Sequence, residues 1–558
     1  MSRMQNVVVS SVKTALGWVP AQWLPGGKPD PLIGRSAAIG RQGSRLDGPE
    51  KVGGRAQFAA EVAMEGLCYA SLVHATITRG RMTRLDTSAA EAAPGVILVV
   101  THRNMPRISP VPLIGVTNLS AVGNSSLPIL QDDAVHYNGQ VVAAVLAETQ
   151  EQADHAASLI EIDYAAEPAK TRFDEAKAQA RTPASILIEK NQVSVGDAER
   201  ELGRAAHRVD NLYRTPGHNH NAIELHGVTV AWDGDTLLVH DATQMIAPSA
   251  NALAKLFGLK PGQVRVLSPF VGGGFGGKGL WDHQIVAIAA ARLAGRPVRL
   301  VLDREGVYRM IGGRTPSEQR VALGADADGR FTALIHTGYS IMPTYGACPE
   351  QFSLSARALY SSKSFEIVQR HIDLAIVPNT YMRAPGGDRH LRSGVRRRRT
   401  RACDGDRSDR AAPPQRARAP PDPRRRLLAA RADQGLCRRC GAVRLGTAGG
   451  DPGHTPRGRM AHRHGLRERQ LPYARMPGAN VRLTLHGDGS ATLASSAQEM
   501  GMGTATVQVQ HAADRLGLPV EAVRFDMGDS ALPAGPMAGD RRRRCRSPRR
   551  SWPPPTSS

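Results

Sequence analysis

Cysteine is scarce in this sequence. It has six cysteines in 558 residues, and only Cys68 and Cys348 lie outside two arginine-rich stretches. So few cysteines exclude a disulfide framework and favour a reducing compartment such as the cytoplasm. They also exclude a ferredoxin-like set of cluster ligands, so any iron–sulfur cluster is expected on another chain.

Long apolar runs are missing too. No stretch of about eighteen apolar residues occurs, so the sequence predicts no membrane-spanning helix. Near the N-terminus, Val7 to Val9 form too short an apolar core for a secretory signal, and Lys13 and Pro20 interrupt the residues after it. We therefore expect a cytoplasmic protein, which reaches the periplasm only if a partner subunit carries it.

Positive charge is abundant but local. The formal net charge is +22, yet residues 1–387 are nearly balanced, with 38 basic and 35 acidic side chains. Residues 388–470 carry 23 arginines against 8 acidic residues, and residues 540–558 carry seven against one. The charge therefore does not form the domain-wide basic surface that is typical of a nucleic-acid-binding protein.

The stretch 388–470 also lacks Lys, Ile, Asn, Phe, Trp and Tyr. Three explanations are open for this stretch. It could be a basic disordered insert that binds nucleic acid, a solvated linker, or coding sequence read out of frame in a GC-rich gene. We favour the third explanation, here and for residues 540–558, because the character of the sequence changes abruptly after Gly386 and is regained near Leu471, as two compensating frame shifts would produce. The stretch also lacks the aromatic platforms of single-stranded nucleic-acid binders, which argues against the first explanation. On this interpretation Cys437-Arg-Arg-Cys440 is an accident, not a zinc or redox site.

A glycine-rich loop is the most informative feature of the chain. It reads Ser268-Pro-Phe-Val-Gly-Gly-Gly-Phe-Gly-Gly-Lys278, between a predicted strand at 264–267 and a predicted helix at 281–293. Five glycines in six positions allow sharp bends and let backbone N–H groups approach a ligand closely. A helix N-terminus behind the loop favours an anionic or oxygen-rich ligand. The loop is therefore predicted to hold a cofactor.

One candidate cofactor is a nicotinamide dinucleotide. Gly272, Gly274 and Gly277 have the spacing of the dinucleotide fingerprint, and Asp303, at the end of the next predicted strand, would take a ribose hydroxyl. Against this, Phe275 intrudes where close approach is needed, and Lys278 follows the last glycine directly.

Two further motifs extend the pattern, and together the three resemble a known family. Residues 379–386 read Asn-Thr-Tyr-Met-Arg-Ala-Pro-Gly, and residues 497–504 read Ala-Gln-Glu-Met-Gly-Met-Gly-Thr. With the glycine loop, they resemble in sequence and order the pocket motifs of the molybdenum-binding large subunit of the xanthine dehydrogenase and aldehyde oxidoreductase family. The resemblance covers about 36–387 and 471–539.

The resemblance implies an α/β (α+β) fold in which a hammerhead domain precedes an incomplete molybdenum-cofactor-binding domain. The expected segments are an N-terminal extension at 1–35, the hammerhead domain at 36–168, a first cofactor-binding domain at 169–387, the stretch 388–470, the start of a second cofactor-binding domain at 471–539, and the basic tail 540–558.

It also implies which residues form the site. Phe275 and Arg383 would line the pocket, and His218 stands where many relatives carry a glutamine that binds a metal-bound oxygen. The family's general base, a glutamate in Gly-x-Gly-Glu, has no match here. The expected cofactor contacts are Gln244, Gly273, Gly274, Phe275, Gly276, Arg383, Gln498, Gly501, Met502, Gly503 and Thr504.

The implied activity is hydroxylation of an aldehyde or an N-heteroaromatic carbon, with water as the oxygen donor. The implied cofactor is molybdenum–molybdopterin in its cytosine dinucleotide form, in which the pterin holds the metal without a side-chain ligand. Electrons would leave through an iron–sulfur subunit and an FAD subunit. Gly279 stands where purine-oxidising relatives carry a glutamate, which favours aldehydes. Without the general base, the chain as written is expected to lack activity.

Zinc is a further alternative to weigh. His218 and His220 are two apart, and on a strand they would point to the same face. No third ligand lies nearby at metal spacing, so hydrogen-bonded polar residues at a loop edge are the favoured interpretation.

Overall fold

The computed structural model describes residues 37–39, 43–111, 123–186, 189–346, 348–353, 356–359, 361–383 and 480–535. The predicted extension 1–35, the arginine-rich stretch 388–470 and the basic tail 540–558 lie outside these residues. Within the described part, no helix is long and apolar enough to cross a membrane.

The largest element is a mixed seven-stranded sheet that joins the first unit to the second. Strand β1 comes from the predicted hammerhead unit and pairs in parallel with β14, with Cys68 opposite Val298. Strands from both sides of the domain boundary predicted near residue 168 therefore belong to one continuous sheet. In spatial order the strands are β13 (Val264–Leu267), β12 (Thr236–Asp241), β11 (Gly227–Asp233), β14 (Val298–Val301), β1 (Cys68–His74), β5 (Val141–Ala147) and β3 (Val96–Thr101).

Helices cover both faces of this sheet. Strand β5 is buried along its whole length. Its Ala144 and Leu146 join the main core with α8, whereas Val145 packs with α4 residues in a separate cluster. Because alternate residues of a strand point to opposite faces, α8 and α4 lie on opposite sides. The helices around the sheet are α3 (Ser88–Glu91), α4 (Gln150–Ser158), α7 (Ile246–Leu256), α8 (Asp282–Ala294) and α9 (Arg304–Met310).

The sequence accounts for where these helices begin and end. Thr149 and Gln152 form a capping box at the start of α4, and Asp303 caps α9 by accepting from the Gly306 N–H at 2.5 Å. Helix α8 ends at Gly295, whose φ of 64° suits glycine at a C-cap. Ten successive residues of α8, from Asp282 to Ala291, are buried.

A small antiparallel sheet completes the first unit. Strand β2 lies between the other two, and its Met82 packs with Val135 and Val142. Strands β2 and β4 were not among the strands predicted from sequence. The three strands are β4 (Ala134–Val135), β2 (Gly80–Asp86) and β6 (Glu161–Ala166).

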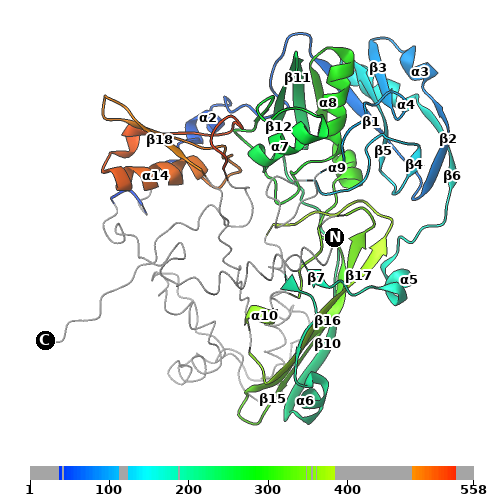
Figure 1. Cartoon of the computed structure of the whole chain (residues 1–558), viewed down its shortest axis with the longest axis vertical. Helices are drawn as coiled ribbons and strands as arrows, with labels where there is room; N and C mark the ends of the chain where they lie inside the picture. The colour runs from blue at the N-terminus through cyan, green and yellow to red at the C-terminus, as the bar shows by residue number, and fades with distance from the viewer. Residues whose placement is uncertain are drawn as a thin grey trace, which may run out of the picture.

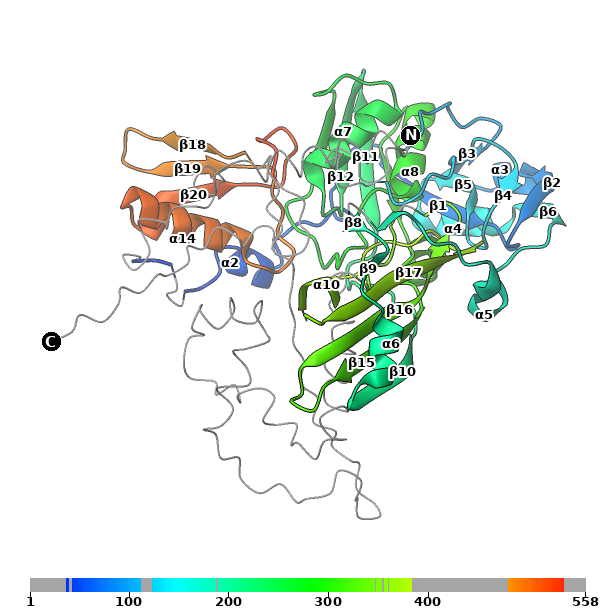
Figure 2. The same cartoon turned by 60° about the horizontal axis from the view of Figure 1, so that its bottom comes forward.

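A five-stranded sheet extends away from the seven-stranded one in both views (Figures 1 and 2). Its core strands are long, and β16 pairs in parallel with β17 over their whole shared length. Helix α6 packs on one face, and a short hairpin of β7 and β8 precedes it in the chain. The elements are α5 (Phe173–Ala176), η1 (Lys177–Gln179), β7 (Ser185–Ile186), β8 (Glu189–Lys190), β9 (Val193–Val195), α6 (Ala198–Arg204), β10 (His207–Thr215), β15 (Ser317–Ala325), β16 (Phe331–Pro343), α10 (Ala356–Leu359) and β17 (Ser364–Leu374).

The last described segment, 480–535, forms a third unit at the left of Figure 1. Helix α14 packs on the strands through Val509, Ala512 and Ala513. The N-terminal helix α2 lies beside this unit in both views, although more than four hundred residues separate them in the chain (Figures 1 and 2). The elements are α2 (Gly48–Val52), β18 (Arg482–Leu485), β19 (Ala491–Ala494), α14 (Thr504–Leu516), η6 (Val520–Ala522) and β20 (Val523–Asp526).

Candidate cofactor site

The glycine loop between β13 and α8 is hydrogen-bonded to the side chain of Gln244. This side chain is buried, and its Oε1 accepts from the Gly276 N–H at 2.9 Å and the Lys278 N–H at 3.3 Å. The Gln244 N–H in turn donates to the Lys278 carbonyl at 2.9 Å. A single side chain thus positions the C-terminal half of the loop.

The second motif crosses the loop at Gly276. An added Cβ at this glycine would lie 1.9 Å from the Tyr381 carbonyl oxygen, so only glycine allows the approach. One residue earlier, the Phe275 carbonyl accepts from the Arg383 N–H at 2.6 Å. Phe275 has a φ of 50°, unusual for a residue with a side chain, and its ring is 36% exposed.

We expect Gly276→Ala to destabilise the chain by about 2–3 kcal/mol, because it adds a backbone clash to the strain of a positive φ. Gly329→Ala is the matched control: its φ of +77° is also positive, but an added Cβ there meets nothing within 4 Å. Urea unfolding of both variants measures the difference. Equal losses would show that the approach to Tyr381 is not needed.

The third motif joins the same loop. The Gln498 side chain donates from Nε2 to the Gln244 carbonyl oxygen. Glu499 pairs through its backbone with the loop: its N–H donates to the Pro269 carbonyl at 3.0 Å, and its carbonyl accepts from the Val271 N–H at 2.9 Å. The glycine loop is therefore hydrogen-bonded directly to both of the other motifs, which lie far from it in sequence.

The start of α14 differs from the sequence prediction. Residues 501–504 were expected to offer bare amides to the cofactor. Instead the buried Glu499 carboxylate accepts from the Gly503 N–H at 3.0 Å and the Thr504 N–H at 2.5 Å. Arg45 pairs with the same carboxylate at 3.1 Å and donates to the Gly501 carbonyl at 3.0 Å. The prediction was wrong for the amides of Gly503 and Thr504, because a carboxylate five residues back already occupies that helix N-terminus. Met502 is half-buried.

The helix behind the glycine loop also differs from expectation. Its first residues, Asp282 to Gln284, are buried. The Trp281 N–H donates to Gln284 Oε1 at 2.7 Å, so the helix caps itself. The amides that remain for a ligand are those of Gly273, Gly274 and Phe275, for which no protein acceptor occurs in the part of the chain that the structure describes.

Lys278 ends the loop as a buried cation. Its side chain is 0% exposed, and Nζ lies 2.5 Å from Glu224 Oε2. Burial lowers the pKa of Lys278, and Glu224 opposes that shift. Glu224 Oε2 also accepts from the Gly272 N–H at 2.6 Å, so the ion pair ties both ends of the glycine run together.

Further ionisable groups lie buried around this pair. Burial lowers the pKa of His226 to about 3, and its Nε2 lies 3.2 Å from the Gly277 carbonyl oxygen. Burial raises the pKa of Asp241 to about 7, although Gln284 Nε2 lies 3.2 Å from both of its oxygens. These groups are held uncharged by desolvation.

Asp241 makes stability depend on pH. Its carboxyl is protonated up to about pH 7 in the folded chain but ionises near pH 4 when unfolded, so stability falls as the pH rises from about 4 to 7. Because asparagine does not ionise, the loss of stability between pH 4 and pH 8 should be about 2–4 kcal/mol smaller in Asp241→Asn than in the wild type, with little difference at pH 4. The measurement is urea unfolding from pH 4 to 8, with the exposed Asp328→Asn as control. An unchanged slope in Asp241→Asn would contradict the assignment.

The two histidines considered for zinc do not form a pair. Residues 216–226 lie outside the strands of the described part, so the strand geometry weighed for zinc is absent, in agreement with the favoured interpretation of polar residues at a loop edge. His218 forms an isolated bridge with Arg314. His218 is exposed, whereas His220 Nε2 lies 2.9 Å from the Tyr381 carbonyl oxygen. Among the described residues, no group of three or more His, Cys, Asp and Glu could hold a metal ion.

The sheet order is incompatible with a dinucleotide-binding unit. In that unit the strands before and after the helix are parallel neighbours. Here β12 and β11 lie between β13 and β14. The carboxylate of Asp303, considered for a ribose, is used to cap α9. The nicotinamide hypothesis therefore lacks its structural basis.

Some residues of the site were missed from sequence. Asn124 is buried and lies 2.9 Å from Thr380 Oγ1, across 256 residues of sequence. Glu499 stood inside the third motif but was not assigned a role. Arg45 was not assigned a role either. No local signal identifies Asn124, whereas a glutamate just before a glycine-rich helix start is a readable cap signal.

Comparison with known proteins agrees with the three motifs. The family described as "Aldehyde oxidase and xanthine dehydrogenase, a/b hammerhead domain" matches residues 53–168. Two families described as "Molybdopterin cofactor-binding domain" match 180–391 and 459–539. The aldehyde oxidoreductase molybdenum-binding subunit PaoC of Escherichia coli O157:H7 is 30% identical over 525 residues, which cover 91% of this chain and 68% of PaoC.

The chain is a molybdenum-binding subunit of the xanthine dehydrogenase and aldehyde oxidoreductase family. Its members are molybdenum hydroxylases, and the domains matched here bind molybdopterin. A second relative is the 6-hydroxypseudooxynicotine dehydrogenase complex subunit gamma of Paenarthrobacter nicotinovorans, 29% identical over 54% of this chain and 39% of its own length.

Solved structures share the fold of this molybdenum-binding subunit. Quinoline 2-oxidoreductase from Pseudomonas putida 86 has a TM-score of 0.69 at 19% identity and covers 91% of this chain and 68% of its own. The aldehyde oxidoreductase from Desulfovibrio gigas has a TM-score of 0.66 at 19% identity, over 89% and 57%. The expected α/β architecture, a hammerhead domain followed by cofactor-binding domains, is confirmed.

Proposed function

We propose that this subunit binds molybdenum–molybdopterin between the three motifs and belongs to a complex that oxidises aldehydes or N-heteroaromatic compounds. One observation carries the proposal: Gln244 is hydrogen-bonded both to the glycine loop and to Gln498, while Arg383 is hydrogen-bonded to Phe275. Three separated pieces of main chain therefore meet at one place, as a single large ligand requires.

The residues present suit a pterin with phosphate and carbonyl oxygens. The amides of Gly273, Gly274 and Phe275 supply donors, and the glycines allow the close packing that presents these amides. A Cβ at Gly274 would lie 2.4 Å from the Gln244 side chain, and one at Gly273 would lie 2.9 Å from the Phe275 ring. We assign Gln244, Gly273, Gly274, Phe275, Gly276, Gln498, Gly501, Met502, Gly503 and Thr504 to the cofactor cradle. Gly503 and Thr504 act there through side chain or shape, because Glu499 takes their amides.

When bound, the cofactor supplies a metal centre for oxidative hydroxylation, with water as the oxygen donor. The chain's own residues orient the substrate and exclude water. Phe275 offers an exposed ring to a flat substrate, and the exposed guanidinium of Arg383 offers a rigid fork of donors to its oxygens. His218 is exposed, so its assignment to the pocket is the weakest of these. Gly279 leaves no carboxylate after the lysine, which favours aldehydes over purines.

The finer assignments rest on the relatives. PaoC is named as one subunit of an aldehyde oxidoreductase, and the nicotine-related protein as one subunit of a complex. We propose an iron–sulfur subunit and an FAD subunit as partners in the cytoplasm, and the cytosine dinucleotide form of the cofactor.

We further propose that residues 388–470 and 540–558 are out of frame and that the chain as written binds cofactor without turning over substrate. The family matches stop at 391 and resume at 459, and no Gly-x-Gly-Glu sequence is present to supply the general base.

The test is expression of the full chain with molybdate. The purified protein is assayed for molybdenum, for pterin fluorescence and for a nucleotide released by acid. We expect stoichiometric molybdenum and pterin, cytidine monophosphate as the nucleotide, and no aldehyde oxidation. The gene re-read in shifted frames after 387 and 539, co-expressed with its partners, should oxidise aldehydes. A chain that holds no molybdenum, and whose 272–278 loop is protected by NAD, would contradict the proposal.

A further inference from the structure

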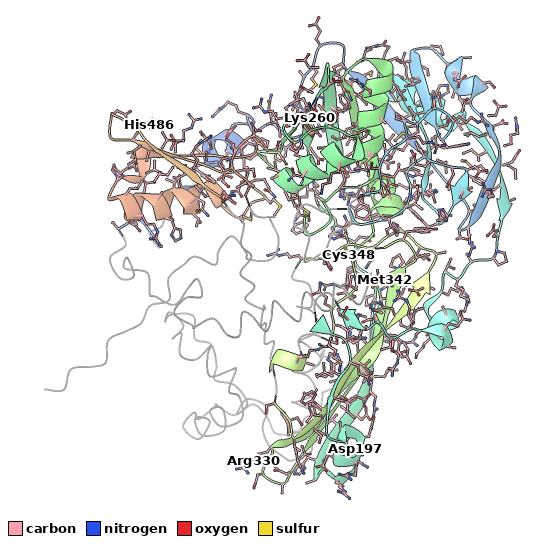
Figure 3. The ribbon with its side chains drawn as sticks, in the orientation of Figure 1. Asp197, Lys260, Arg330, Met342, Cys348 and His486 are labelled. Atoms are coloured by element: carbon pink, nitrogen blue, oxygen red, sulfur yellow. The ribbon has the colours of Figure 1, made fainter. Side chains whose placement is uncertain are left out.

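The underside of the glycine loop carries a buried polar cluster that the cofactor assignment does not use. It consists of Asn124, Cys348, Asn379 and Thr380, all less than 5% exposed. Cys348 is labelled in Figure 3, where it lies between the seven-stranded unit and the five-stranded sheet. An isolated bridge between Gly123 and Leu280 brings the Asn124 segment beside the end of the loop.

The cluster reaches the loop through one hydroxyl. Thr380 Oγ1 lies 3.1 Å from the Gly276 carbonyl oxygen and 2.9 Å from Asn124 Oδ1. Both neighbours are acceptors, but a hydroxyl has one hydrogen and can donate to only one of them at a time. With the Asn124 amide in this orientation, one of the two contacts has no hydrogen.

The same amide has a second inconsistency. Asn124 Nδ2 is buried and has no hydrogen-bond partner among the described residues. On the other side, Asn124 Oδ1 lies 3.4 Å from Cys348 Sγ. A buried amide NH₂ without an acceptor costs about 1–3 kcal/mol. The oxygen and nitrogen of a side-chain amide have nearly the same shape, so the surrounding hydrogen-bond pattern decides which is which.

Exchanging the two amide atoms removes the first inconsistency and gives both amide hydrogens an acceptor. The amide oxygen then takes the position that has no partner, which costs less because buried carbonyl oxygens lack a partner more often than N–H groups do. The NH₂ group then has two hydrogens and two acceptors, the Thr380 hydroxyl oxygen and the Cys348 sulfur. The Thr380 hydrogen is released for the Gly276 carbonyl. Burial raises the pKa of Cys348 to about 12, although Thr380 and Tyr381 oppose that shift, so the sulfur is a neutral thiol and a weak acceptor.

We propose that Asn124 is a positioning residue: its NH₂ group donates to Thr380, whose hydroxyl donates to the Gly276 carbonyl. Gly276 is then held on both sides, at its N–H by Gln244 and at its carbonyl by Thr380. This relay sets the direction of the Phe275–Gly277 backbone, and its value for cofactor retention rests on the function proposed above. Because each hydrogen bond in the relay polarises the next, Asn124 acts on the loop without touching it.

Two substitutions at Thr380 test the last step on the full chain. Thr380→Val removes the hydroxyl and keeps the shape, whereas Thr380→Ser keeps the hydroxyl. We expect amide hydrogen exchange in the peptide covering 272–278 to become about tenfold faster in Thr380→Val. Molybdenum loss during dialysis should accelerate by a similar factor, and Thr380→Ser should match the wild type in both. If Thr380→Val does not fold, Asn124→Asp carries the same test.

Asn124→Asp decides the orientation of the amide. Asn124 is 1% exposed, so burial would raise the pKa of the introduced carboxyl, and the variant is compared with the wild type at about pH 9, where the carboxylate is ionised and can only accept. It then draws the Thr380 hydrogen away from Gly276, and the loop should exchange as fast as in Thr380→Val. If the oxygen of Asn124 faced Thr380, the aspartate would preserve that contact and loop exchange would not change, which would overturn the proposal. Thr344→Val is the matched control: it removes a threonine hydroxyl that donates to the Leu374 carbonyl at 3.1 Å, and should lower the unfolding midpoint without altering loop exchange.

Failure of this inference can be told apart from failure of the proposed function. Hydrogen exchange reads the relay in cofactor-free chain as well. A chain without molybdenum that still shows the Thr380→Val effect on the loop would contradict the function and support the relay. Normal molybdenum content with no effect of either substitution would contradict the relay alone.

Discussion

Lys278→Met is expected to destabilise the folded chain by about 3–5 kcal/mol, because it leaves the buried Glu224 carboxylate without its cation. Glu224 would keep its hydrogen bond from the Gly272 N–H, but its Oε1 already has no partner among the described residues. Its charge would then be uncompensated. Urea unfolding at pH 7 measures the loss.

Two further variants make this result specific. Lys278→Met combined with Glu224→Gln should recover most of the stability, because no buried charge remains. Lys363→Met is the matched control, since Lys363 is 71% exposed and its pairing with Glu201 at 3.2 Å is worth under about 1 kcal/mol. If both Lys→Met variants lost the same stability, the buried pair would have no special role.

Glu499→Ala is expected to have a comparable effect, about 3–5 kcal/mol, through a different route. The change leaves two buried N–H groups, those of Gly503 and Thr504, without an acceptor at the start of α14. It also removes one partner of Arg45, although that arginine is 42% exposed and keeps its pairing with Asp47 at 2.8 Å.

Because the Glu499 side chain caps α14 inside the third unit, this loss should be local first. Limited proteolysis should cut within 480–535 before it cuts the rest of the chain. Glu521→Ala, an exposed glutamate of the same unit, serves as control and should behave as the wild type. Uniform cleavage along the chain in Glu499→Ala would contradict a local role.

Much of the fold could be predicted from sequence because periodicity and turn signals are local. The helix predicted at 281–293 and the strand predicted at 264–267 correspond to α8 and β13 within one residue at each end. Strand β2, Gly80–Asp86, was missed because its polar residues outnumber its apolar ones; it is stabilised by pairing with β6. Tertiary pairing overrides weak local preference.

In the candidate site, too, features with a local sequence signal were predicted and features that depend on tertiary contacts were missed. The motifs located the loop, Gln244 and Gln498, and the structure brings them together. The prediction for the amides of Gly503 and Thr504 was wrong because a glycine-rich motif does not show which acceptor its N–H groups bond; here it is the Glu499 carboxylate. The contribution of Asn124 depends on a contact across 256 residues, which a single sequence cannot show. The identity of the cofactor came from family resemblance, not from spacing.

The pairing of β1 with β14 limits how this protein can be divided. Although family matches separate residues 53–168 from 180–391, Cys68 to Ala70 are hydrogen-bonded in register to Val298 to Leu300 in the middle of the sheet. Cutting the gene near residue 168 would expose two hydrophobic strand edges at once, and such edges promote aggregation. Chimeras that exchange the first unit between relatives must therefore carry over a compatible β14, and any shortened version of the protein should keep both regions on one polypeptide.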